Sequence, residues 1–135
     1  MSLGTNDLML CAGTLMTTPL VDRIAPTAKA GFQGLSVFTT DFATAATDGV
    51  SIEELRRRIE GAGLQVGEVD PLANWFPSAN QNQGLLAATQ DEVFASASRI
   101  SARSVTSMVF SATPPIPKGC RSYRLRFLHR RQVLI

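Results

Sequence analysis

The chain has 135 residues, which is enough for one domain with an apolar core. Its apolar fraction is 44%, yet no apolar run approaches the roughly 18 residues that span a membrane, and the first residues lack the basic start of a secretory signal. Cys11 and Cys120 form no motif, so we expect a cytoplasmic protein without membrane partners.

The net charge of +2 divides unevenly along the chain. Residues 1–117 contain seven Lys or Arg and eleven Asp or Glu and sum to −4, whereas residues 118–135 contain six Lys or Arg and no acid and sum to +6. The change follows the run TPPIP. We therefore predict a folded region over 1–113 and a basic tail over 114–135.

The first predicted strand is 8–12, LMLCA, a compact apolar run. A helix follows, with Thr18 as its N-cap, a kink or a restart at Pro26 and an end at Gly31. The next run, 34–40, predicts a second strand. The small polar residues after it predict a loop.

The clearest helix is predicted over 51–64, where Ser51 and Glu54 form a capping box. Arg56, Arg57 and Arg58 form its solvated face in the simplest interpretation. Gly63 ends this helix.

The rest of the folded region repeats the pattern. A strand is predicted over 65–70, and a long loop over 71–88. A third helix follows over 89–102, capped by Thr89, and then a fourth strand over 103–110.

The resulting order, β-α-β-α-β-α-β, predicts a parallel sheet, because each parallel connection needs a crossover helix. The sheet is either open and doubly wound or part of a (β/α)8 barrel. The turn after the first strand, CAGTLMTTP, has no G-x-G-x-x-G, which weakens the nucleotide-binding form of the open sheet.

The runs LMLCAGTL, TAKAGFQGLSVF, GVSIEELRRRIEGAGLQVGEVDPLANWF and ISARSVTSMVF together resemble the first half of the xylose-isomerase-like TIM-barrel superfamily. These are the sugar phosphate isomerases/epimerases. The resemblance implies an α/β fold of parallel (β/α) units forming half of a (β/α)8 barrel, followed here by an irregular basic tail. It also implies a sugar-like, polyol or keto substrate in the parent enzyme.

Full-length members of the family commonly hold a divalent metal, whose ligands come mostly from the fifth strand onward. A complete barrel takes about 250 residues and eight strands, so the resemblance covers only half of one. We therefore expect no cofactor and no independent catalysis in this chain, and its catalytic residues stay unassigned. The basic tail matches nothing in the family, and we interpret it as a product of truncation or of a frameshift.

Candidate substrate-binding residues are Glu68, Asp70 and Trp75. Alternate strand residues share a face, so Val66, Glu68 and Asp70 are predicted to point into the barrel, with Asp70 at the carboxyl end where barrel enzymes place their sites. The alternative is structural: Glu68 forms an interior ion pair and Asp70 caps the turn before Pro71. Two carboxylates without a histidine or a third acid make a poor cage for a catalytic transition metal.

The tail contains the only histidine, His129, and the aromatic residues Tyr123 and Phe127 among its arginines. A ligand or general-base role for His129 is not expected. Phosphate contacts and stacking would suit nucleic acid, but composition alone does not make nucleic acid the expected partner. We expect instead an incidental extension.

A half-barrel leaves two edge strands with unpaired backbone groups. We therefore expect a homodimer, or else aggregation. The alternative to an enzyme fragment is a non-catalytic half-barrel that acts by self-association.

Overall fold

A computed structural model of the chain describes residues 3–75 and 86–108. The elements are β1 (Met9–Leu10), the 3₁₀ helix η1 (Ala12–Leu15), α1 (Leu20–Lys29), β2 (Gly34–Phe38), α2 (Thr39–Thr47), α3 (Ile52–Gly61), β3 (Gln65–Leu72), α4 (Gln90–Arg99) and β4 (Ser104–Ser107). The basic tail and most of the loop between β3 and α4 lie outside the described residues. No helix of the described part is long and apolar enough to cross a membrane.

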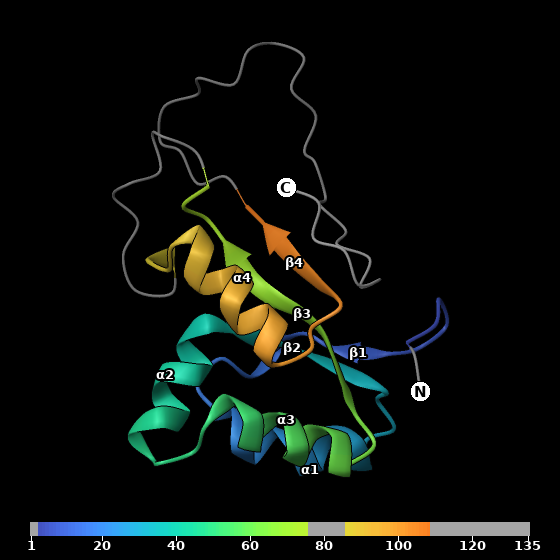
Figure 1. Cartoon of the computed structure of the whole chain (residues 1–135). Coiled ribbons are helices and arrows are strands. Elements are labelled where there is room, and N and C mark those ends of the chain that lie inside the picture. Colours follow the sequence, from blue (N-terminus) through green and yellow to red (C-terminus); the bar gives the residue numbers. More distant parts are fainter. Residues whose placement is uncertain (1–2, 76–85, 109–135) are drawn as a thin grey trace.

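The four strands form one parallel sheet in the order β1-β2-β3-β4 (Figure 1). Every connection between neighbouring strands passes through a helix, as a parallel sheet requires. The predicted fold class, an α/β fold of consecutive (β/α) units, is confirmed. Residues 30–34 and 62–66 occupy equivalent helix-to-strand junctions: Gly31 and Gly63 adopt φ values of 84° and 77°, at the ends of α1 and α3.

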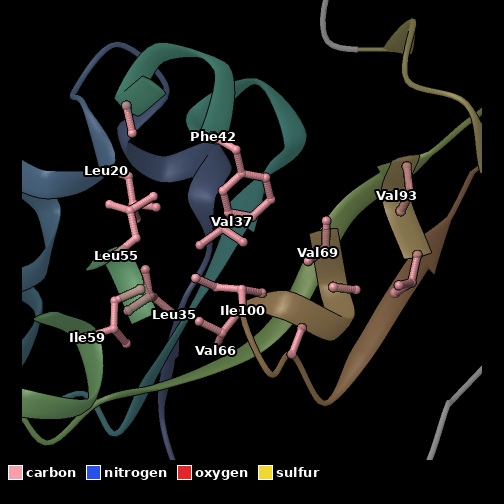
Figure 2. Packing of buried hydrophobic residues seen from close by; sticks show 14 of the residues in the cluster. Leu20, Leu35, Val37, Phe42, Leu55, Ile59, Val66, Val69, Val93 and Ile100 are labelled. Atoms are coloured by element: carbon pink, nitrogen blue, oxygen red, sulfur yellow. The ribbon is translucent and has the colours of Figure 1, made fainter. Parts of the chain in front are cut away.

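One face of the sheet packs against the helices. Leu35 and Val37 of β2 and Val69 of β3 point from the sheet toward the apolar faces of α1 to α4 (Figure 2). The helices contribute Leu20, Ile24, Phe42, Ala45, Leu55, Ile59, Val93, Ala97 and Ile100 to the same cluster. The opposite face of the sheet carries no helix of the described part, and we call it the inner face.

Two helices begin as predicted, although one of the caps is simpler. In α4 the box is complete: Thr89 Oγ1 accepts from Glu92 N, and Glu92 accepts from Thr89 N, a bond that lowers the pKa of Glu92. In α3 the Ser51 hydroxyl accepts from Glu54 N. The Glu54 carboxylate instead accepts a hydrogen bond from Arg58 Nε, which lowers the pKa of Glu54. The predicted capping box, in which Glu54 would accept from the Ser51 N–H, was therefore wrong in this second bond.

The segment predicted as a polar loop after β2 is the helix α2. Its sequence, TTDFATAAT, is rich in alanine, which loses no side-chain entropy in a helix. Asp41 Oδ2 accepts from the Phe38 backbone N–H at 2.8 Å and so caps the first turn. Gly49, with φ 74°, follows its end. Small residues and a capping acid therefore make a helix where periodicity was weak.

The observed ends of other elements also differ from the predicted ends. Residues 12–15 form η1 rather than the end of the first strand, and β4 is limited to four residues. Helix α1 begins one residue after Pro19 and includes Pro26, instead of restarting there. Pro26 is exposed, so water can hydrate the Asp22 carbonyl that a proline at this position leaves without its helical donor.

Candidate functional site

The two acids of β3 lie on the inner face, as predicted. Glu68 pairs with Ser36 and Asp70 with Phe38, while Val69 between them pairs with Val37 of the core. The register shifts between Leu35 and Ser36, so β3 contains one extra residue, Gly67.

This bulge corrects one part of the prediction. Val66 pairs with Leu35 and packs in the helix-covered core, rather than beside Glu68 on the inner face. A Cβ on Gly67 would overlap the Met9 side chain, which places Gly67 on the inner side. An extra residue reverses the alternation of faces on one side of it. A glycine inside a strand often marks such a bulge, so Gly67 was a signal that the period-two prediction did not use.

The amino-terminal half of the inner face is filled by the start of the chain. Leu3 is only 6% exposed, and it lies over two glycines: a Cβ on Gly34 would come within 3.2 Å of Leu3, and one on Gly67 within 3.6 Å. The Leu3 N–H donates to Gln65 Oε1 at 3.1 Å, and its carbonyl accepts from Arg103. This end of the face is therefore apolar and packed.

The carboxyl-terminal half of the inner face is polar. The Thr106 hydroxyl of β4 donates to Glu68 Oε2 at 2.7 Å. Among the described residues Glu68 forms no ion pair, so the interior ion pair proposed as its structural alternative is absent from that part of the chain. Ser36 accepts from the Ala12 backbone N–H at 2.8 Å, which ties η1 to the middle of β2.

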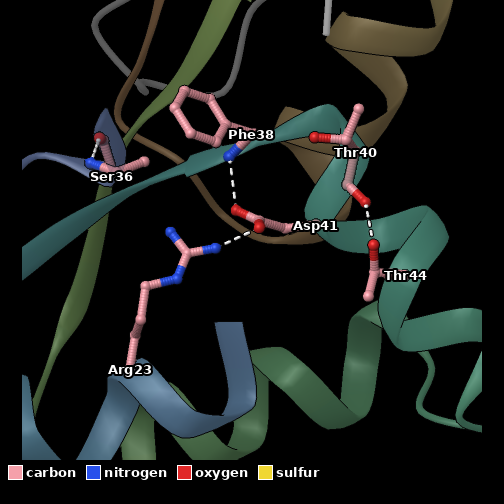
Figure 3. A network of polar contacts seen from close by, with 7 residues as sticks. Arg23, Ser36, Phe38, Thr40, Asp41 and Thr44 are labelled. Carbon is pink, nitrogen blue, oxygen red and sulfur yellow. Dashed lines mark hydrogen bonds and ion pairs between the residues drawn. The ribbon is translucent and has the colours of Figure 1, made fainter. Parts of the chain in front are cut away.

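Asp70 lies at the carboxyl end of this face and is 9% exposed. It is followed directly by Pro71, which β3 includes. Phe38, its partner on β2, points to the side of the strand opposite Arg23 and α1 (Figure 3). Asp70 thus faces the inner side next to an aromatic ring.

Trp75 joins the ends of β3 and β4. Its indole Nε1 donates to the Met108 carbonyl at 3.0 Å, and the Met108 N–H donates to the Leu72 carbonyl at 2.9 Å. The ring remains 42% exposed. Asn74 beside it donates to the Ala87 carbonyl at 2.9 Å, which holds together the two ends of the β3–α4 loop. The structure therefore places all three predicted residues at or near the carboxyl half of the sheet.

The sequence reasoning missed a buried ion pair. Arg23 of α1, 1% exposed, donates to Asp41 at the start of α2 (Figure 3). Burial raises the pKa of Asp41, against the opposing effects of the Phe38 N–H and Arg23. Nε and Nη1 of Arg23 have no acceptor among the described residues.

A signal for this pair existed in the sequence. Arg23 is three residues after Leu20 and four before Thr27, so it falls on the buried face of α1. An arginine at such a position predicts a partner acid, because a lone buried charge is costly. The pair joins α1 to the first turn of α2 and so fixes the backbone beside Phe38.

The described residues do not fit a catalytic metal. No group of three or more His, Cys, Asp and Glu side chains gathers anywhere in the described part. Glu68 and Asp70 alone supply too few ligands of the kinds that catalytic zinc or manganese sites use. We therefore derive no step through a metal.

No protein-family model and no curated sequence matches the chain. Solved structures do resemble it. A xylose isomerase domain containing protein from Salmonella typhimurium LT2 superposes with a TM-score of 0.56 at 13% identity, over 78% of this chain and 37% of the other. D-psicose 3-epimerase, solved in the presence of D-fructose, superposes with a TM-score of 0.52 at 10% identity, over 75% and 36%.

A xylose isomerase domain protein from Alicyclobacillus acidocaldarius gives a TM-score of 0.50 at 15% identity, over 73% and 35%. The chain thus spans little more than a third of the length of these structures. Identities this low establish the fold and nothing finer. In fold, the chain is similar to part of these xylose isomerase domain and epimerase structures.

Proposed function

We propose that the chain is part of a sugar isomerase/epimerase-like enzyme and that its inner face binds a sugar or a related polyol or keto compound. The observation that carries the proposal is the grouping of Glu68, Asp70 and Trp75 at the carboxyl half of the parallel sheet. Barrel enzymes place their sites at this end. The likeness in fold to an epimerase solved with D-fructose supports the same substrate class.

The chemistry of the three residues suits a polyol. Carboxylate oxygens of Glu68 and Asp70 accept hydrogen bonds from hydroxyl groups. The exposed part of the Trp75 ring offers an apolar surface to the C–H face of a sugar. These residues bind and orient in this proposal. Proton transfer is not assigned to them, and we propose that the chain lacks a metal centre and does not catalyse the reaction alone.

Trp75 provides the test, because it is the only tryptophan of the chain. Titration with D-fructose should give a saturable change in its fluorescence, and glycerol at equal hydroxyl concentration should give none. Asp70→Asn should abolish the change, because an amide replaces one of the accepting oxygens with a donor. A linear response, or an equal response in Asp70→Asn, would refute the proposal.

A matched control is Asp48→Asn, which removes the same charge from the exposed end of α2. It should titrate like the parent chain. In the same samples, calorimetric titration with manganese, zinc and magnesium should show no one-to-one binding at micromolar affinity. Such binding, lost in Asp70→Asn, would contradict the proposed absence of a metal centre.

A second candidate function is self-association. In the described part the sheet ends at β1 and β4, and each end strand offers backbone groups that another strand can pair with. We propose a homodimer in which β4 of one chain meets β1 of its partner. Light scattering at low micromolar concentration should then give twice the chain mass, and a monodisperse monomer would exclude this candidate.

A further inference from the structure

The carboxyl half of the inner face carries two acids, and the described residues contribute no Lys or Arg to it. Glu68 and Asp70 both lie there. The seven Lys and Arg residues of the described part lie elsewhere. Six are on helices: Arg23 and Lys29 on α1, Arg56, Arg57 and Arg58 on α3, and Arg99 on α4. Arg103 contacts the Leu3 carbonyl at the amino-terminal end.

The basic tail has the complementary charge. It contains Lys118, Arg121, Arg124, Arg126, Arg130 and Arg131 and no acid. This separation of charge is steep, because residues 1–117 sum to −4 and residues 118–135 to +6. Attraction between such regions acts strongly when they are tethered at short distance, since the Debye length in physiological salt is about 8 Å.

The described chain ends at Met108, at the carboxyl end of this face. Met108 is fixed at the carboxyl end of β3, because its N–H donates to Leu72 and its carbonyl accepts from Trp75. From there, residues 109–117 can extend over about 30 Å, at about 3.3 Å per residue. Lys118 and the arginines beyond it are therefore within reach of Glu68 and Asp70.

We propose that the basic tail binds intramolecularly to the carboxyl half of the inner face, with its arginines on Glu68 and Asp70. Guanidinium groups pair with carboxylates through two parallel hydrogen bonds, which favours arginine for this contact. The tail would then compete with a polyol for the same two acids. The proposal does not depend on the sugar proposal, because its test uses no sugar.

The tail carries a natural labelling site, Cys120, and the only other cysteine is Cys11. A nitroxide on Cys120 of the full-length Cys11→Ser chain broadens amide signals of nearby residues. We expect a several-fold greater loss of signal at Glu68 and Thr106 than at Leu55 and Ile59 of α3. The helices pack on the opposite side of the sheet, so their amides lie farther from a label bound at the inner face and should lose less signal.

Charge variants make the experiment specific. Glu68→Gln/Asp70→Asn should abolish the selective broadening, whereas Asp22→Asn/Asp48→Asn, which removes the same charge from exposed helical positions, should preserve it. Arg124→Gln/Arg126→Gln/Arg130→Gln should also abolish it, and these changes lie outside the described sheet and helices. This second variant keeps the test valid even if the acid variant fails to fold.

Three results would overturn the proposal. One is uniform broadening of both sides of the sheet, and another is selective broadening that survives the arginine variant. The third concerns a mixture of nitroxide-labelled chains of natural isotope abundance with isotope-enriched chains that carry no nitroxide. Selective broadening of the enriched chains would mean that the tail binds to a second copy.

Discussion

The two faces of the sheet differ in polarity and in what covers them. The helix-covered face is apolar and closely packed, and its central residues Val37 and Val69 are fully buried. The inner face is divided: its amino-terminal half is filled by Leu3 over glycines, and its carboxyl-terminal half carries Glu68, Asp70 and Thr106. Packing thus holds the helix-covered face and one half of the inner face, and leaves polar groups at the remaining half.

The difference teaches where function can reside on this chain. A polar group is tolerated on the inner face because hydroxyl groups and backbone of neighbouring strands partner it, as Thr106 does for Glu68. On the helix-covered side the surroundings are apolar, so a charged group needs a partner of opposite charge. The buried ion pair of Arg23 and Asp41 is such a case on this side, and it can be used to test the contrast between the two faces.

The largest expected effect comes from that ion pair. Asp41→Ala removes the acceptor of both the buried Arg23 guanidinium and the Phe38 N–H, whichever protonation state Asp41 has, and we expect a loss of about 3–5 kcal/mol in the free energy of unfolding. Arg23→Met/Asp41→Ala should recover the part of this loss that comes from the unpaired guanidinium, because an apolar side chain of similar length needs no partner. Urea unfolding followed by circular dichroism measures both.

The control for this pair is Glu60→Gln, which breaks the exposed contact with Arg56. It should change the free energy of unfolding by less than about 1 kcal/mol. If Asp41→Ala behaves like Glu60→Gln, the ion pair contributes little and the contrast between the two sides fails.

Isosteric exchanges on the two faces sharpen the comparison. Val69→Thr puts a hydroxyl into the apolar core and should cost about 1–3 kcal/mol. Thr106→Val removes the donor to Glu68, which is half-buried, and should cost only about 1 kcal/mol. The same unfolding experiment compares them, and equal costs would mean that the two faces do not differ in polarity as the structure indicates.

The packed half of the inner face predicts a difference between two glycines. In Gly34→Ala the new Cβ would lie 2.8 Å from the Gln65 carbonyl oxygen, which is backbone and cannot move freely. In Gly67→Ala it would meet the Met9 side chain, whose end can rotate away. We expect a loss of about 1–3 kcal/mol for Gly34→Ala and a smaller one for Gly67→Ala. The reverse order in thermal unfolding would contradict the close approach of Gly34 to the Gln65 backbone.

The smallest effect is the pH dependence of Asp41. Burial raises its pKa in the folded chain, so the folded state holds a proton that the unfolded chain has already released. Its contribution to stability is therefore complete below the ordinary pKa of about 3.9 and is lost as the pH rises through the raised value. A carboxyl-carbon NMR titration measures this pKa directly. A value at or below the ordinary one would mean that Arg23 outweighs burial.

Local chemistry was enough to predict much of the architecture. The Ser51 and Thr89 caps, the apolar spacing of α3 and α4, and Gly31 and Gly63 at helix ends are all contacts between residues close in sequence. Such signals act within one or two helical turns, so a reader of the sequence can find them. The alternation of helices with strands then required a parallel sheet.

Local sequence patterns predicted the position of the candidate site only in part. Period-two spacing put Glu68 and Asp70 on one face, and that held because no bulge separates them. Val66 was assigned to the wrong face because the bulge at Gly67 depends on how β3 pairs with β2, which is a contact between distant residues. The joining of Trp75 to Met108 likewise exists only once β3 and β4 lie side by side.

The sequence by itself therefore determined the four strands, the helices α1, α3 and α4, their order and the two acids of the inner face. Helix α2 was missed although its cap is local, because its apolar periodicity is weak. Only the tertiary structure decided that Arg23 meets Asp41 and that Leu3 fills the space above Gly34 and Gly67. The physical reason is range. Helix caps and periodic faces are set by bonds and sterics between near neighbours, whereas burial, ion pairing and strand register depend on segments that the chain brings together only by folding.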